Sequence, residues 1–269
     1  MRAPMQLVAG EVVVVGSDRG GVGKTMTAEI VATRMELSGV VPIIIEVEAE
    51  PRLRDVFGSG YVNTIRISRH TPEAIERDPS LLYEVWDELG DAVLTANRPV
   101  VIDLGANLTR ALAMYLNEVG QDGPFGLGEQ LWFLGVTGSD RFSLNSLNYG
   151  LSYMSQVVPA SHRWIVINEQ NNRFSVASDS DAIQTMVRNH GVEGVMRLPA
   201  CTSPALQVVV DAPMRVTSAA EQDADFWISK GYGNSESRRA VRKFRRFLVD
   251  AVDMLDPIFP YPEPARVAR

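Results

Sequence analysis

The sequence predicts an α/β protein built on one doubly wound, mostly parallel β-sheet with helices on both faces. Short apolar runs alternate along the chain with longer segments whose apolar residues recur every three or four positions. The runs are continuous rather than interrupted by polar residues, which is typical of parallel strands covered by helices on both faces. The chain has 269 residues without an internal repeat or a low-complexity linker, so we expect a single domain over 1–269.

Each expected element has a local signal. The strand at 12–15 is a run of valines that leads through a glycine-rich turn into a helix at 25–37. Thr71 and Pro72 mark a later helix start, because threonine caps helices and proline fits the first helical position; helical sequence then continues to about Ala96. Polar residues at 222–234 form a connection into a last helix. The other expected strands are 42–47, 99–104, 131–136, 164–168 and 195–198, and the other expected helices are 108–117, 143–157, 179–190, 203–210 and 235–255.

Composition excludes several classes of protein. No stretch approaches the roughly 18 apolar residues that a membrane span needs, and the start of the chain has no secretory signal, so we expect a cytoplasmic protein. The single cysteine, Cys201, excludes a disulfide framework and a metal site with several cysteine ligands from one chain; we expect it to be a packed residue. A net charge of −7 argues against a chain that coats nucleic acid over its whole surface.

A glycine-rich loop carries the first functional signal. Residues 16–25 read Gly-Ser-Asp-Arg-Gly-Gly-Val-Gly-Lys-Thr between the first strand and the first helix. The strict P-loop pattern has glycine where this chain has Asp18, so that pattern fails. The physical requirements are nevertheless met, because the glycines let backbone N–H groups turn toward phosphates and the helix N-terminus adds partial positive charge. We expect Lys24 to contact the β- and γ-phosphates and the Thr25 hydroxyl to bind Mg²⁺.

The loop resembles the deviant P-loop of the ParA/MinD family of ATPases, whose motif is Lys-Gly-Gly-x-Gly-Lys-Thr. The resemblance covers about 12–216 and implies a P-loop NTPase fold, ATP and Mg²⁺ as cofactors, and a homodimer on ATP binding. Arg19 stands where the family has a lysine that reaches the partner's ATP; arginine keeps that charge, although this chain uses arginine nearly everywhere. The nucleotide-binding positions that the resemblance implies are Gly20, Gly21, Val22, Gly23, Lys24, Thr25, Met26, Asn168 and Pro199. Asn168 would lie beside the adenine, and a turn asparagine is the alternative.

Acidic residues at two strand ends complete the expected site. The family places an Asp-x-Asp after its second strand, and its second aspartate orients the attacking water. Counting without gaps from Lys24 puts that motif on Glu46 and Glu48. The family also has a proline just after the motif, and aligning that proline with Pro51 selects Glu48 and Glu50 instead. Glu48 is in both alignments and is our choice, although all three could be solvated strand-end acids. Asp103 ends the strand that resembles Walker B and is expected in the Mg²⁺ shell, with a capping aspartate as the alternative.

The last expected helix, 235–255, is amphipathic and basic. Six basic residues and no acid lie within 238–246. ParA-type proteins bind DNA near this end, whereas MinD-type proteins bind membrane through an amphipathic tail. Residues 257–269 are proline-rich and expected to be extended, so DNA is favoured over membrane; a solvated face or a protein-docking surface remains open. The expected buried stripe is Val241, Phe244, Leu248, Val252 and Leu255, and the expected DNA-binding residues are Arg239, Arg242, Lys243 and Arg246.

Together these features predict a Mg²⁺-dependent ATPase that positions DNA cargo, such as a plasmid or a transfer complex, with a protein adaptor or activator. Lys24, Glu48 and Arg19 are expected to carry catalysis. One alternative is a nucleotide-gated interaction protein that hardly hydrolyses ATP, because Glu48 is not aspartate and Arg19 is not lysine. The other is a small-molecule ligase or kinase of the dethiobiotin synthetase type, for which the sequence shows no second substrate motif.

Overall fold

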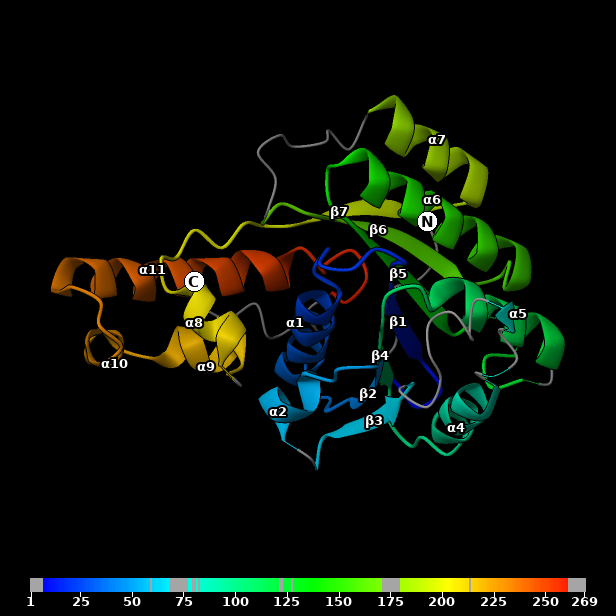
Figure 1. The fold of residues 1–269 in the computed structure, drawn as a ribbon, viewed down its shortest axis with the longest axis horizontal. Helices are drawn as coiled ribbons and strands as arrows, with labels where there is room; N and C mark the ends of the chain where they lie inside the picture. The colour runs from blue at the N-terminus through cyan, green and yellow to red at the C-terminus, as the bar shows by residue number, and fades with distance from the viewer. Residues whose placement is uncertain are drawn as a thin grey trace.

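A seven-stranded, all-parallel sheet forms the centre of the protein (Figure 1). The computed structural model describes residues 7–58, 60–67, 77–78, 81, 83–120, 123–126, 128–170, 180–212 and 214–260. The strand order is β3-β2-β4-β1-β5-β6-β7. The strands are β1 (Val12–Gly16), β2 (Ile43–Glu48), β3 (Val62–Arg66), β4 (Val100–Leu104), β5 (Leu131–Thr137), β6 (His162–Asn168) and β7 (Gly194–Leu198). The predicted fold class is confirmed.

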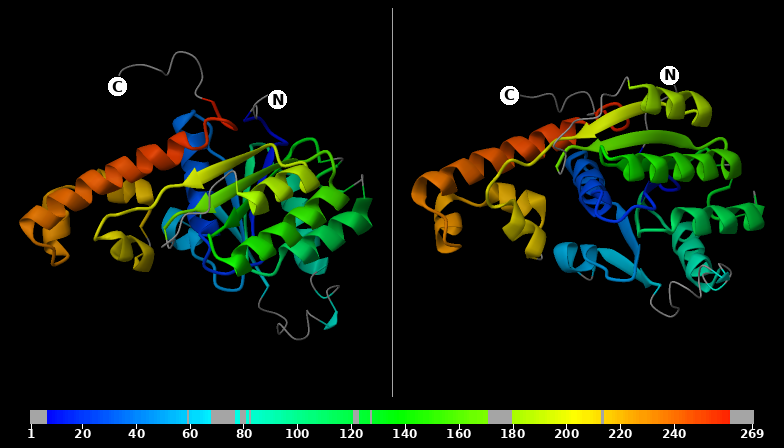
Figure 2. Two further views of the ribbon diagram at one scale, coloured as in Figure 1. Left: turned by 90° about the horizontal axis from the view of Figure 1, so that it is seen from above. Right: turned by 45° about the horizontal axis from the view of Figure 1, so that its top comes forward.

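Helices cover both faces of the sheet (Figure 2). One hydrophobic cluster packs α4, α5, α6 and α7 on one face, and a second packs α1 and α11, with α2 and α8 to α10, on the other. The helices are α1 (Lys24–Leu37), α2 (Leu53–Phe57), α4 (Tyr83–Leu94), α5 (Thr109–Val119), α6 (Arg141–Val157), α7 (Asp181–His190), α8 (Leu206–Asp211), α9 (Val216–Glu221), α10 (Ala224–Ser229) and α11 (Asn234–Asp253). In the described part of the chain, no helix combines the length and the hydropathy that a membrane span requires.

The central strand β1 fixes where a ligand can bind. Its valines are buried between β4 on one side and β5 on the other, with Val15 level with Asp103. After β1 the chain crosses to β2, whereas after β4 it crosses in the opposite direction to β5. Ligands of such sheets bind beyond the carboxyl ends of the strands, where the direction of crossing changes. The glycine-rich loop follows β1 at this place.

Several local expectations differ from the structure, and neither α2 nor α9 was predicted. The edge strand β3 was not predicted, because only Val62 and Ile65 are buried and the intervening residues are partly or fully exposed, so the strand has no continuous apolar run. The segment 222–234 was expected to be a connection but contains α10, whose first turn is capped by the Asp223 carboxylate accepting from Phe226 N at 2.9 Å. The expected helix start at Thr71 and Pro72 lies outside the described residues.

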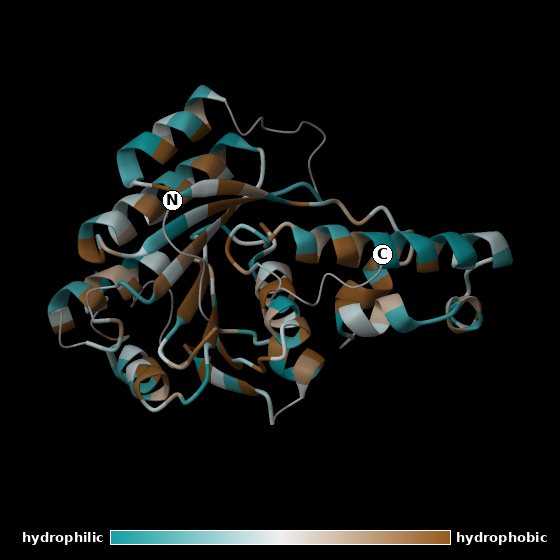
Figure 3. Ribbon diagram, turned by 180° about the vertical axis from the view of Figure 1, so that it is seen from behind, coloured by the Kyte–Doolittle hydropathy of each residue, from teal (hydrophilic) through white to brown (hydrophobic). Residues whose placement is uncertain are grey.

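Helices α8 to α11 form an arm beside the sheet (Figure 1). The outer part of α11 packs on α9 and α10, and its other end packs against α1. Figure 3 shows long hydrophilic stretches along α11, interrupted by hydrophobic positions, and Phe244, Phe247 and Val252 are among its buried residues.

Sequence analysis predicted an extended tail from residue 257, but the structure has a packed turn there. Ile258 and Phe259 are fully buried, and the backbone oxygen of Phe259 accepts a 2.9 Å hydrogen bond from Nε of Arg34. The Arg34 guanidinium also pairs with Asp256 at 2.8 Å. Two apolar side chains between the prolines therefore hold this turn on α1, and residues 261–269 lie outside the described part.

Candidate functional site

The loop from β1 to α1 has the backbone that phosphate binding requires. Gly21 and Gly23 have φ values of 71° and 98°, a left-handed conformation that side chains other than glycine's rarely adopt. Gly23 is the N-cap of α1 and has no side chain with which to cap it. The N–H groups of its first turn, with the partial positive charge of the helix end, are thus available to an anion.

The Lys24 side chain binds back to the backbone of its own loop. Its side chain is buried, and Nζ donates a 3.0 Å hydrogen bond to the backbone oxygen of Arg19. Burial lowers the pKa of Lys24, while the nearby carboxylates of Asp103, Glu48 and Asp18 oppose this change. The ammonium thus faces the acids at the ends of β2 and β4 and is held where phosphates would meet it.

Asp103 and Thr25 supply side-chain oxygen atoms of the kind that Mg²⁺ binds. Burial raises the pKa of Asp103 to about 7, although a hydrogen bond with the Thr25 side chain acts in the opposite direction. Its Oδ1 is buried without a hydrogen-bond partner among the described residues, which is unusual for a carboxylate. A carboxylate oxygen left unpaired beside a hydroxyl is a donor set that suits Mg²⁺, which takes few protein oxygens and keeps several waters. The residues present therefore fit the ion.

Glu46 and Glu48 lie in the last part of β2 and Glu50 follows the strand, and the three have separate environments. Glu46 is buried level with Asp103, and its carboxylate accepts from the backbone N–H groups of Arg52 at 2.5 Å and Leu53 at 2.8 Å. It thereby caps α2 and is not a solvated acid. Glu48 lines the cavity described below, whereas Glu50 is exposed and does not line it. A Cβ on Gly105 would lie 2.8 Å from Oε2 of Glu48, so Glu48 packs closely against the segment after β4.

Arg19 is exposed. One charged residue that it influences is Asp140, the N-cap of α6. Hydrogen bonds from Ser143 and Phe142 lower the pKa of Asp140, and the positive charge of Arg19 adds to this effect. Arg19 does not line the cavity described below.

Asn168 is tied to the phosphate loop. Its Nδ2 donates a 2.8 Å hydrogen bond to the backbone oxygen of Val22, and its Oδ1 accepts from Gln170 N at 3.0 Å. The Gln170 side chain in turn accepts from the backbone N–H of Cys201 at 2.6 Å and donates to its oxygen at 3.3 Å. Neither tie was predicted, because each joins residues that are far apart in the sequence.

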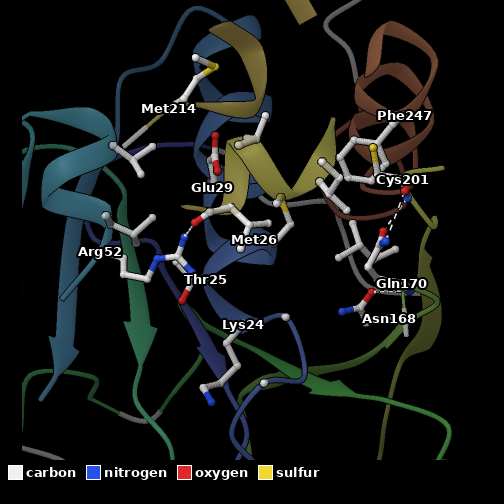
Figure 4. Close-up of a pocket in the computed structure, with 18 of the residues that line it drawn as sticks. Lys24, Thr25, Met26, Glu29, Arg52, Asn168, Gln170, Cys201, Met214 and Phe247 are labelled. Carbon is white, nitrogen blue, oxygen red and sulfur yellow. Dashed lines mark hydrogen bonds between the residues drawn. The ribbon is translucent and has the colours of Figure 1, made fainter. Parts of the chain in front are cut away.

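One cavity of about 420 Å³ brings most predicted site residues together (Figure 4). Of the predicted nucleotide-binding residues, only Val22 does not line it; Val22 lies buried beneath the loop. Asp103 is buried and does not line the cavity either. The cavity continues between α1, α2 and α8, where sequence analysis missed Glu29 and Arg52. Burial raises the pKa of Glu29 to about 7, and its carboxylate accepts from Val216 N at 2.5 Å. The other lining residues that were missed are Leu53, Val56, Ala106, Gln170, Leu198, Cys201, Leu206, Val209, Val210, Met214 and Phe247.

The basic face of α11 is partly anchored. Lys243 donates to the backbone oxygen of Thr202 at 2.8 Å, so its ammonium is held on the body. Arg239, Arg242 and Arg246 are exposed, and Arg246 also pairs with Asp250 at 3.4 Å. The expected buried stripe is confirmed for Phe244, Val252 and Leu255, while Val241 and Leu248 are half-buried at its edge. Ser237, Ala240, Phe247 and Ala251 complete the buried face.

Comparison with known proteins gives structural matches only. No protein-family model and no curated protein sequence matches the chain. The MinD cell division protein of Aquifex aeolicus is 13% identical with a TM-score of 0.44, and the match covers 89% of this chain and 97% of MinD. A nucleotide-binding protein of Archaeoglobus fulgidus, in complex with ADP, is 14% identical with a TM-score of 0.45, over 74% of this chain and 85% of that one.

A plasmid partition protein of Borrelia burgdorferi bound to AMPPNP is 12% identical with a TM-score of 0.36, over 70% of this chain and 86% of that one. The strand order and the phosphate loop of the chain itself establish its α/β fold with a P-loop. The chain is similar to MinD and to plasmid partition proteins and has the parallel-sheet, P-loop architecture predicted from its sequence.

Proposed function

We propose that the protein is a Mg²⁺-dependent ATPase of the ParA/MinD type that positions or partitions DNA cargo. The observation that carries the proposal is the buried ammonium of Lys24, held by the phosphate loop and facing the carboxylates of Asp103 and Glu48. A fixed cation, an uncapped helix end and converging acids are the parts that phosphoryl transfer requires.

In this proposal, the loop binds the phosphates of ATP. N–H groups of residues 20–25 donate to phosphate oxygens, and Lys24 exchanges its bond to Arg19 O for the β- and γ-phosphates. Thr25 and Asp103 would hold Mg²⁺, directly or through water, and the ion would supply positive charge against the same phosphates. Asn168 and Pro199 border the base end of the cavity together with Met26.

Glu48 is the residue that we assign to the attacking water. Of Glu46, Glu48 and Glu50, it alone lines the cavity, since Glu46 is occupied in capping α2 and Glu50 is exposed. Arg19 is assigned to the partner's ATP in an ATP-bound homodimer, since its side chain is exposed and does not line the cavity of its own chain. Both assignments depend on charge placed at a developing transition state.

The exposed arginines of α11 are the proposed contact with DNA phosphates. Arg239, Arg242 and Arg246 lie on its outer face, whereas Lys243 contributes less because Thr202 already binds it. A protein adaptor or activator completes the proposed system.

A second candidate is an ATP-gated interaction protein with little hydrolysis. The observation that favours it is the 2.9 Å hydrogen bond from Ala49 N to Oε1 of Glu48, which holds the carboxylate on its own backbone. Steady-state phosphate release with Mg²⁺-ATP, measured with and without DNA, separates the two. Release above the buffer rate supports the ATPase, and tight ATP binding without release supports the interaction protein.

A further inference from the structure

Asp18, the residue that breaks the strict P-loop pattern, contacts a helix far along the chain. Its Oδ1 accepts a 3.0 Å hydrogen bond from the backbone N–H of Thr109, 91 residues later. Thr109 is the fully buried first residue of α5. The N-cap of α5 is Leu108, which cannot cap, and the first turn contains no acid. The phosphate loop thus supplies the cap that α5 itself lacks.

This contact fixes one end of the segment that follows Asp103. At its other end, Gly105 N donates to Val47 O at 2.8 Å, and Gly105 packs on Glu48. Between these ends Ala106 lines the cavity, and Asn107 has a left-handed φ of 62°. Residues 105–108 are therefore held across the phosphate side of the cavity by β2 and by Asp18.

The charge of Asp18 suits both neighbours. A carboxylate is stabilised at the N-terminus of a helix by its partial positive charge. The same carboxylate is one of the acids that oppose the lowered pKa of Lys24. Glycine at this position, as the strict pattern has it, would leave the Thr109 N–H without this acceptor.

We propose that Asp18 is a positioning residue for ATP hydrolysis. By capping α5 it holds residues 105–108, and through Gly105 the Glu48 carboxylate, in fixed register with the phosphate loop. The inference rests on the proposed function and adds a residue to it. Small displacements of a reacting group slow chemistry more than they weaken binding, so loss of the cap lowers kcat and leaves KM nearly unchanged.

The test compares Asp18→Ala with Asp18→Asn. The asparagine side-chain oxygen can still accept from Thr109 N, whereas alanine cannot. We expect Asp18→Ala to lower kcat about tenfold or more, with KM and ADP affinity within about threefold of wild type. Asp18→Asn should recover most of kcat. Hydrogen exchange of the peptide 105–112 should be faster in Asp18→Ala than in Asp18→Asn.

The outcomes separate this inference from the proposed function. If wild type turns over ATP and Asp18→Ala is equally fast, or Asp18→Asn is as slow as Asp18→Ala, the positioning role is wrong. If wild type releases no phosphate with or without DNA, the proposed ATPase fails and the kinetic role of Asp18 fails with it. Should Asp18→Ala not fold, as monitored by circular dichroism, Asp18→Asn decides: near-wild-type kcat and protection support the cap, and their loss overturns it.

Discussion

The side-chain amide of Asn168, at the end of β6, donates a 2.8 Å hydrogen bond to the backbone oxygen of Val22 in the phosphate loop. In a trans peptide the N–H points opposite to the preceding carbonyl, so this bond also turns the N–H of Gly23 away from Asn168. A Cβ on Gly23 would lie 2.2 Å from the same amide nitrogen. The resemblance implied a place beside adenine for Asn168. In the structure Asn168 also binds the phosphate loop and fixes the orientation of one of its peptides.

Asn168→Ala should weaken Mg²⁺-ADP binding about tenfold, because the loop loses the contact that sets its peptide orientation. Asn168→Asp should be at least as weak, since a carboxylate cannot donate to Val22 O and adds negative charge near the phosphates. Isothermal calorimetry measures both, with exposed Asn145→Ala as control. Wild-type affinity in both variants would show that the loop keeps its shape without Asn168.

Replacing Glu46, Glu48 or Glu50, which lie at or just after the end of β2, should affect different measured quantities. Glu48→Ala should leave nucleotide affinity intact and lower phosphate release, because the cavity loses its water-orienting carboxylate. Glu46→Ala should instead cost about 1–2 kcal/mol of unfolding free energy, because the N-terminus of α2 loses its cap. Glu50→Ala should change neither quantity. Full turnover in Glu48→Ala with loss in Glu50→Ala would show that the alignment on Pro51 is correct.

The exposed arginines of α11 should bind DNA through phosphates, so affinity should fall steeply with salt and be independent of sequence. Replacing Arg239, Arg242 and Arg246 with Glu should weaken binding to all sequences and leave ATP affinity unchanged. A triple variant with the same charge change elsewhere, Arg98→Glu, Arg110→Glu and Arg188→Glu, is the control, because those residues are exposed on other elements. Anisotropy titrations with ATP at two salt concentrations measure this. Equal loss in both triples would indicate an effect of net charge alone.

Glu29 should make stability depend on pH. Burial raises its pKa from 4.5 to about 7, so between these values the unfolded chain releases the proton while the folded chain keeps it. Stability therefore falls as pH rises through this window, by about 3 kcal/mol when complete, since each tenfold change in proton affinity is about 1.4 kcal/mol. Glu29→Gln should match wild type near pH 4.5 and be more stable at pH 8, as measured by urea unfolding, with Glu50→Gln as control. The same difference at both pH values would contradict this account.

Much of the site was predictable because its signals are local. The valine run of β1, the glycines after it and the apolar strand before Asp103 each specify structure within a few residues. Three other contacts could not be predicted, because each pairs a side chain with a backbone group that only the folded chain brings near. They are the cap of α5 by Asp18, the cap of α2 by Glu46 and the hydrogen bonds between Gln170 and Cys201. The turn at 257–259 was predicted to be part of an extended tail because the prolines outweighed the signal of two apolar residues, Ile258 and Phe259, which are buried.

Calorimetric titration of Mg²⁺-ATP into wild type, Lys24→Ala and Lys230→Ala tests the central claim most directly. Lys24 is the buried cation of the phosphate loop, whereas Lys230 is exposed after α10 and controls for the loss of a lysine. The account predicts binding in wild type and Lys230→Ala and no detectable binding in Lys24→Ala, because the β- and γ-phosphates lose their fixed cation. No binding in wild type, or equal affinity in all three proteins, would contradict it.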